Sequence, residues 1–213
     1  MFNALMSFPA EKVVILKERA SASYHLSAYF MAKTTSDAPV RLVLPFLYMT
    51  TSFWMAGIDD RFGVFLASTG CTLLSVLAGE SLGLLVGASI SAMDKALTVM
   101  TISTLTLMLL GGFFVENIPS FVKWARFLSP FKYAFDGSLQ LVFDRDVPCD
   151  GTGALENLCR GRSEGYAASE DVLKTLGVQG SISFNIGMLF VICLLPRYLA
   201  YLALRRQKGV ERS

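Results

Sequence analysis

Four long apolar segments divide the chain, and each is long enough to cross a bilayer as an α-helix. A spanning helix needs about 20 predominantly apolar residues. The segments cover residues 38–57, 62–90, 96–115 and 181–204. Short polar stretches separate the first three segments, whereas a long mixed stretch precedes the fourth. The pattern therefore predicts an all-α polytopic membrane protein with four transmembrane helices.

One acidic residue, Glu80, lies deep inside the second segment. Because a carboxylate is costly to bury in lipid, an intramembrane acid is a candidate functional residue. It could instead hold helices together as a protonated or hydrogen-bonded carboxyl, with Ser75 and Ser81 as donors on its own helix. The sequence leaves both interpretations open. Near the end of the fourth segment, Arg197 is placed where its side chain could extend to the lipid headgroups.

The third segment contains no charged residue and ends in Gly111-Gly112-Phe113-Phe114. Aromatic residues at a helix end commonly form the interfacial belt of a membrane protein. Two bulky rings beside glycines could also close a pore against a second copy of the chain. Both roles are open for Phe113 and Phe114.

The stretch before the first span, residues 11–36, is amphipathic and contains interspersed charges. It could lie on the membrane surface or dock a soluble partner. A second mixed stretch, residues 118–143, has too many charges to span and is interrupted at Ser129-Pro130. We expect two short helices there, at the outer membrane interface.

The distribution of lysine and arginine predicts the orientation of the helices, because short basic loops stay in the cytoplasm. Both ends of the chain are basic, so we expect both to be cytoplasmic, with residues 116–180 forming an extracellular loop. Cys149 and Cys159 lie in this loop. They are either two free thiols or a disulfide, and a disulfide would stabilise the fold by about 2–3 kcal/mol.

Composition and motifs exclude several function classes. The chain has 213 residues, of which 53% are hydrophobic, and its mean hydropathy is +0.51, which is too apolar for a soluble domain. The net charge of +2 is spread along the chain, so nucleic acid is not an expected partner. The single histidine, His25, excludes a multi-histidine metal site. No P-loop motif occurs, and glycines 79, 83 and 87 have the spacing of helix-packing positions.

Several sequence stretches together resemble the G subfamily of ABC transporters, the White and breast-cancer-resistance type of half transporter. They read EKVVILKERASASYHLSAYFMAKTTSDAPV, FWMAG and LLGGFFVENIPSFVKWARFLSPFKYAFDGSLQLVF, followed by a cysteine-bearing loop and a last helix that ends in Arg-Arg. The most specific parts are Glu18-Arg19 with Tyr29 and Lys33, and the run from Gly111 to Gly137. The resemblance implies that residues 1–213 are one partial transmembrane domain containing the family's helices three to six.

The resemblance also implies roles for individual positions. Residues 11–37 correspond to the cytoplasmic coupling region, which receives the movement of the ATPase domains and contains Glu11, Glu18, Arg19 and Tyr29. Leu105 and Met108 correspond to the wall of the central lipophilic cavity, and Phe113 and Phe114 to the valve above it.

In this family an ATPase domain precedes the membrane domain in the same polypeptide. The resemblance therefore implies that ATP and magnesium bind to a domain outside this chain, and that the chain is a fragment or a short gene product. The implied partners are a second half transporter, in a homo- or heterodimer, the ATP-binding domain, membrane lipids and a lipophilic substrate. The implied location is the plasma membrane.

Three functions are compatible with these residues. The leading hypothesis is the membrane half of a dimeric, ATP-driven exporter of a lipid, a sterol or a drug-like compound, since the third segment offers apolar and hydroxyl groups without charge. The alternative is a non-transporting protein that pairs with full-length half transporters and modulates them. A third hypothesis, a proton-coupled carrier built around Glu80, is disfavoured because four unrepeated helices are few for alternating access.

Overall fold

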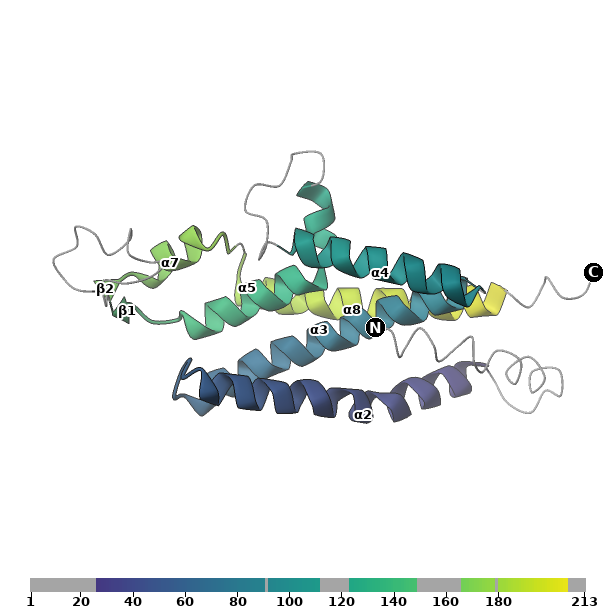
Figure 1. The fold of residues 1–213 in the computed structure, drawn as a ribbon, viewed down its shortest axis with the longest axis horizontal. Coiled ribbons are helices and arrows are strands. Elements are labelled where there is room, and N and C mark those ends of the chain that lie inside the picture. Colours follow the sequence, from purple (N-terminus) through teal and green to yellow (C-terminus); the bar gives the residue numbers. More distant parts are fainter. Residues whose placement is uncertain (1–25, 91, 112–122, 149–165, 179, 207–213) are drawn as a thin grey trace, which may run out of the picture.

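The computed structural model describes residues 26–90, 92–111, 123–148, 166–178 and 180–206. Within these residues the chain is almost entirely helical, with the long helices running side by side (Figure 1). The elements are α2 (Leu26–Met55), α3 (Phe62–Ser89), α4 (Met93–Leu110), the 3₁₀-helix η1 (Lys123–Leu128), α5 (Pro130–Val142), β1 (Val147–Pro148), β2 (Tyr166–Ala167), α7 (Ser169–Thr175) and α8 (Ile182–Arg206). The all-α class predicted from the apolar segments is confirmed.

Three of the four predicted spans are helices long and apolar enough to cross a membrane, namely α3, α4 and α8, when only the described residues are considered. Most of the first predicted span, residues 38–55, lies within α2, which begins at Leu26 and therefore also includes the end of the amphipathic stretch. Pro39, Arg41 and Pro45 are inside this helix. They make α2 less apolar than the other three long helices, so its role as a span stays a prediction.

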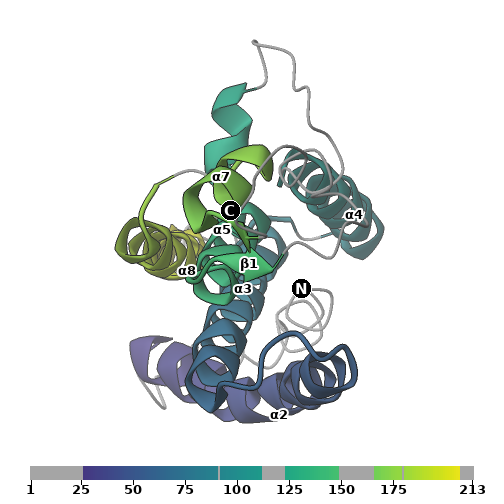
Figure 2. The same ribbon diagram turned by 90° about the vertical axis from the view of Figure 1, so that its left-hand side faces the viewer.

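Helix α3 is the centre of the bundle, and α2, α4 and α8 lie on different sides of it (Figure 2). Its small residues Gly79, Gly83 and Gly87 are buried, as are Ser75 and Ala78. Small side chains let helix backbones approach closely in a membrane, and α8 packs extensively along α3. The burial of the three glycines agrees with the packing role predicted for them.

The break predicted at Ser129-Pro130 separates η1 from α5. Pro130 takes the first position of α5, where a missing backbone N–H costs nothing, and the Ser129 hydroxyl donates to the carbonyl of Leu107 at 2.7 Å. Two short helices were expected at this place. However, α5 is not confined to a surface, because it packs against both α3 and α8 and its residues Lys132, Tyr133 and Asp136 are buried.

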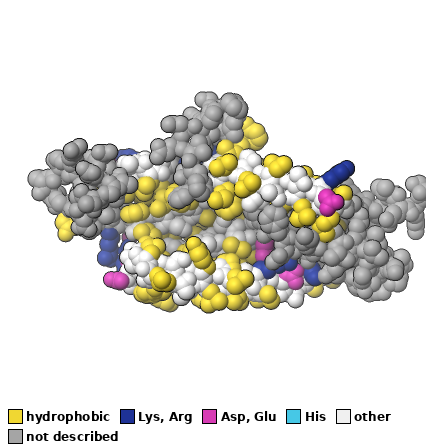
Figure 3. All heavy atoms as spheres, viewed as in Figure 1, with side chains coloured by type: hydrophobic (Ala, Val, Ile, Leu, Met, Phe, Trp, Pro, Cys, Tyr) yellow, Lys and Arg dark blue, Asp and Glu magenta, His cyan; other side chains and the backbone are white. Residues whose placement is uncertain are grey.

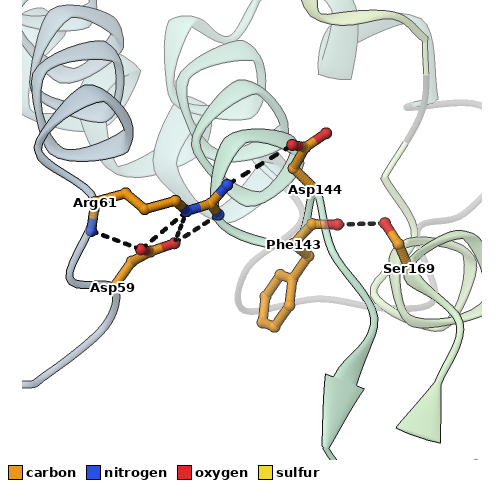
Figure 4. Close-up of polar contacts among 5 residues, drawn as sticks. All are labelled: Asp59, Arg61, Phe143, Asp144 and Ser169. Atoms are coloured by element: carbon orange, nitrogen blue, oxygen red, sulfur yellow. Dashed lines mark hydrogen bonds and ion pairs between the residues drawn. The ribbon is translucent and has the colours of Figure 1, made fainter.

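Side-chain contacts join the loop between α2 and α3 to the segment that follows α5 (Figure 4). Arg61 donates from Nη2 to Asp59 at 2.6 Å, and its Nη1 lies 3.8 Å from the Asp144 carboxylate. The Ser169 hydroxyl at the start of α7 donates to the carbonyl of Phe143. The antiparallel pair β1 and β2, in the register Val147↔Ala167 and Pro148↔Tyr166, adds a small ladder beside these contacts.

The Asp59–Arg61 contact should make stability depend on pH. The Arg61 side chain and backbone N–H hydrogen-bond to Asp59 and hold the pKa of this carboxyl below its ordinary value of 3.8. A lowered folded-state pKa stabilises the protein above the unfolded-state pKa, and this contribution is lost as the pH falls through the folded-state value. Asp59→Asn should therefore flatten the acid limb of the melting temperature measured below about pH 4. Asp60→Asn, at the exposed neighbour, is the control, and an equal change in both variants would contradict the prediction.

Candidate functional site

Charged side chains of two helices meet inside the bundle around Glu80. Arg41 of α2 donates from Nη2 to the Asp37 carboxylate at 2.7 Å, one helical turn away. Its Nε lies 3.9 Å from Oε1 of Glu80 on α3. The side chains of Arg41 and Glu80 are 17% and 6% exposed. Figure 3 shows acidic and basic side chains close together over one part of α2, beside apolar ones.

Arg197 of α8 is a second, partly buried cation at this level of the bundle. Its Nε donates to the Ser81 hydroxyl at 2.9 Å, and Ser81 in turn donates to the carbonyl of Leu77 at 2.8 Å. The Ser81 oxygen also lies 3.7 Å from the sulfur of Cys193. The Nε side of the Arg197 guanidinium faces α3 and takes the hydroxyl expected to serve Glu80, while its extension to the headgroups stays a prediction.

This cluster can connect three helices. A buried charge is tolerated when an opposite charge and hydrogen bonds replace its water shell. Arg41 supplies that replacement for both Asp37 and Glu80, and Arg197 ties α8 to α3 through Ser81. The partner of Glu80 is therefore on another helix. Sequence reasoning missed Arg41, although its position four residues after Asp37 is the spacing of a helical ion pair.

Helix α4 carries the residues predicted to line a substrate cavity. It packs on α3 mainly through Ala96 and Met100, which are buried against apolar side chains such as Leu82 and Val86. Leu105 and Met108 face away from this contact and are 56% and 41% exposed. The two therefore lie on an apolar surface of α4 that the described residues leave uncovered.

A separate cavity of about 380 Å³ lies on another side of α4, where α3 and η1 complete the wall. Leu107 and Leu110 of α4 and Trp124 of η1 contribute to its lining, together with Leu85 of α3. Leu105 and Met108 do not belong to this cavity. The structure thus separates the predicted cavity residues from this cavity.

Several predicted site residues lie outside the described residues. They are Glu11, Glu18 and Arg19 of the coupling region, Phe113 and Phe114 of the valve, and the cysteines Cys149 and Cys159. Tyr29 belongs to α2, but its side chain is also outside the description. Their roles remain predictions.

A second buried ion pair was not predicted from the sequence. Lys132 and Asp136, four residues apart on α5, are each 2% exposed, and Lys132 Nζ lies 3.0 Å from Asp136 Oδ2. The ammonium is also 4.9 Å from the ring centre of Tyr133 and 5.7 Å from that of Phe127. The spacing signals a helical pair, but only the packing of α5 on α3 and α8 buries it.

Comparison with known proteins identifies the family of this chain. Residues 1–143 match the family described as ABC-2 type transporter. ABC transporter G family member 21 of Arabidopsis thaliana is 32% identical over 96% of this chain and 29% of its own length. The protein white of Drosophila melanogaster is 28% identical over 96% of this chain and 30% of its own length.

A third relative, the ABC transporter ATP-binding protein/permease wht-1 of Caenorhabditis elegans, is 34% identical over 63% of this chain and 21% of its own length. The chain spans about 30% of the length of the first two relatives, and less of the third. The family match covers more than half of the chain, and the apolar helices agree with an integral membrane protein. The chain therefore belongs to the ABC-2 type transporter family, with relatives among the G family members and White.

Proposed function

We propose that the chain forms membrane helices of an ATP-driven exporter of lipophilic compounds, working with an ATP-binding domain and a second half transporter in the plasma membrane. The observation that supports this most directly is the uncovered surface of α4 around Leu105 and Met108. Only 11% of the most apolar 18 residues of α4 are buried, against 44% in α3. A surface of this kind is available to form one wall of a shared cavity.

The chemistry of this surface suits a lipophilic cargo. The exposed side chains of α4 that do not line the 380 Å³ cavity include Leu105, Met108 and Leu109, together with the hydroxyl-bearing Thr101. Such walls bind apolar molecules and orient them through a few polar groups. In this proposal, Phe113 and Phe114 close the cavity beyond the end of α4.

The energy for export would come from ATP bound with magnesium on another domain. The wht-1 relative is named as both an ATP-binding protein and a permease. Movement of the ATP-binding domains would reach α2 through residues 11–37, including Glu11, Glu18, Arg19 and Tyr29. Because α2 is continuous from Leu26 to Met55, a push on its first turns would be carried along the whole helix.

Transport measurements test this proposal. In proteoliposomes that contain the chain joined to an ATP-binding domain, a lipophilic fluorescent compound should be exported only with ATP. Leu105→Ala combined with Met108→Ala should raise the KM for transport by about tenfold or more, because two apolar contacts with the cargo are lost. Leu66→Ala, at an exposed leucine of α3, is the matched control and should leave the KM unchanged.

Two outcomes would contradict the proposal. Uptake driven by a proton gradient without ATP would indicate a carrier. Absence of export, together with inhibition of a co-expressed full-length half transporter, would indicate a modulating protein.

A further inference from the structure

A cavity of about 440 Å³ lies between the first turns of α2 and the last turns of α8. These two helix ends are at the same end of the molecule (Figure 1). Phe30 of α2 and Tyr201 of α8 meet edge to face beside it, with ring centres 6.1 Å apart, and pack against Leu84 and Ala88 of α3. The cavity therefore lies between α2 and α8, beside an apolar cluster to which α3 contributes, and its volume is that of a small-molecule site.

Among the described residues that line this cavity, Arg197 is the charged one. Its Nε donates to Ser81, but its Nη2 is buried without a hydrogen-bond partner in the described structure. An unpaired buried N–H group is costly. Because a guanidinium matches the geometry of phosphate oxygens, an anionic phosphate would satisfy this group better than a neutral acceptor.

A second cation, Arg41, already has acidic partners. Arg41 interacts with both Asp37 and Glu80, at 2.7 Å and 3.9 Å. These three groups together carry one net negative charge, which partly compensates the charge of Arg197. They leave its Nη2 without an acceptor, however, and the further polar groups of the lining are the hydroxyls of Ser27, Thr34, Thr35, Tyr198 and Tyr201.

Arg197 lies in the part of α8 that approaches the second interface of a bilayer. It lies about 23 Å along the helix from Ile182, at 1.5 Å per residue. The hydrocarbon core is about 30 Å thick, so a span that begins near Ile182 brings Arg197 toward the opposite interface. At the rim of the cavity, Met31, Leu194 and Tyr198 are 64%, 61% and 63% exposed and need an apolar cover.

We propose that this cavity binds an anionic phospholipid from the leaflet at the end of the bundle where α2 begins and α8 ends. Its phosphate accepts hydrogen bonds from Arg197, and one acyl chain covers Met31, Leu194 and Tyr198. The apolar rim favours a lipid over free phosphate, because free phosphate would leave these three side chains uncovered. The site is a property of the membrane helices themselves, so it does not depend on the export activity.

Lipid retention tests this site. The full chain is incorporated into nanodiscs of phosphatidylcholine and phosphatidylglycerol and extracted in mild detergent, and the retained lipid is counted by native mass spectrometry. Phosphatidylglycerol should be retained over phosphatidylcholine, and Arg197→Gln should lower its retention by about tenfold or more, as expected for a lost charged hydrogen bond. Arg205→Gln removes the same charge from an exposed position of α8 outside the lining and should retain the lipid.

A second variant distinguishes loss of the lipid site from a folding defect in Arg197→Gln. Thr34→Trp fills the cavity but keeps the arginine, and it should also release phosphatidylglycerol while the helical circular dichroism signal is preserved. Unchanged retention in Thr34→Trp would overturn the proposal, as would equal losses in the Arg197 and Arg205 variants. Displacement of the lipid by millimolar inorganic phosphate would instead assign the site to free phosphate. Equal retention of phosphatidylcholine and phosphatidylglycerol would contradict the proposed selectivity for an anionic lipid.

Discussion

Asp136→Ala should lower the free energy of unfolding by about 3–5 kcal/mol, because it leaves the Lys132 ammonium buried without its counter-ion. The two side chains are each 2% exposed, and their charged atoms are 3.0 Å apart. The rings of Phe127 and Tyr133 lie near the ammonium but cannot replace a carboxylate. The measurement is unfolding by sodium dodecyl sulfate in bicelles, followed by circular dichroism.

Two further variants separate burial from pairing. Lys132→Met combined with Asp136→Leu should cost much less than Asp136→Ala alone, because no unpaired charge is left inside. Glu170→Ala breaks the exposed Glu170–Lys174 pair of α7, which has the same spacing, and should cost less than about 1 kcal/mol. If Asp136→Ala cost no more than Glu170→Ala, the α5 pair would not be structurally important.

Arg41→Gln should have the second largest effect, a loss of about 3 kcal/mol in the free energy of unfolding. The substitution removes the cation that faces both Asp37 and Glu80, so two carboxylates would remain close together with little solvent. Glu80→Gln in the same chain should recover at least about 1 kcal/mol, since residues in one ionic network are energetically coupled. The same bicelle measurement gives this double-mutant cycle, and strictly additive losses would show that Arg41 and Glu80 do not interact.

The cycle also distinguishes the two roles of Glu80. If its role is only structural, Glu80→Gln alone should leave transport and the pH dependence of transport unchanged while altering stability. A change in the pH profile of transport at unchanged stability would assign the acid to the transport process itself.

Most helix boundaries follow from local chemistry and were therefore predictable. The second and fourth predicted spans, residues 62–90 and 181–204, agree closely with α3 and α8. The start of α5 was set by Ser129-Pro130, because proline fixes the backbone for a first helical turn. The end of α2 at Met55 lies close to the predicted end of the first span at residue 57.

Side-chain partners across helices were not predictable in the same way. Helices α3, α4 and α8 are apolar on most sides, so their periodicity gives little information on which face meets which neighbour. The contacts of Arg41 with Glu80 and of Arg197 with Ser81 depend on the rotation and register of three helices. The sequence placed Glu80 beside serines of its own helix, whereas the structure gives it a cation from α2.

The sequence by itself determined that this is a helical membrane protein, because long apolar segments can satisfy their backbone in lipid only as helices or closed barrels. The sequence also indicated Glu80, because an acidic residue inside an apolar segment can be recognised without a structure. Only the tertiary structure decided that Lys132 and Asp136 are buried, that Arg197 donates to Ser81, and that Leu105 and Met108 remain uncovered. The reason is that burial and pairing arise from how helices pack, and residues distant in the chain determine that packing.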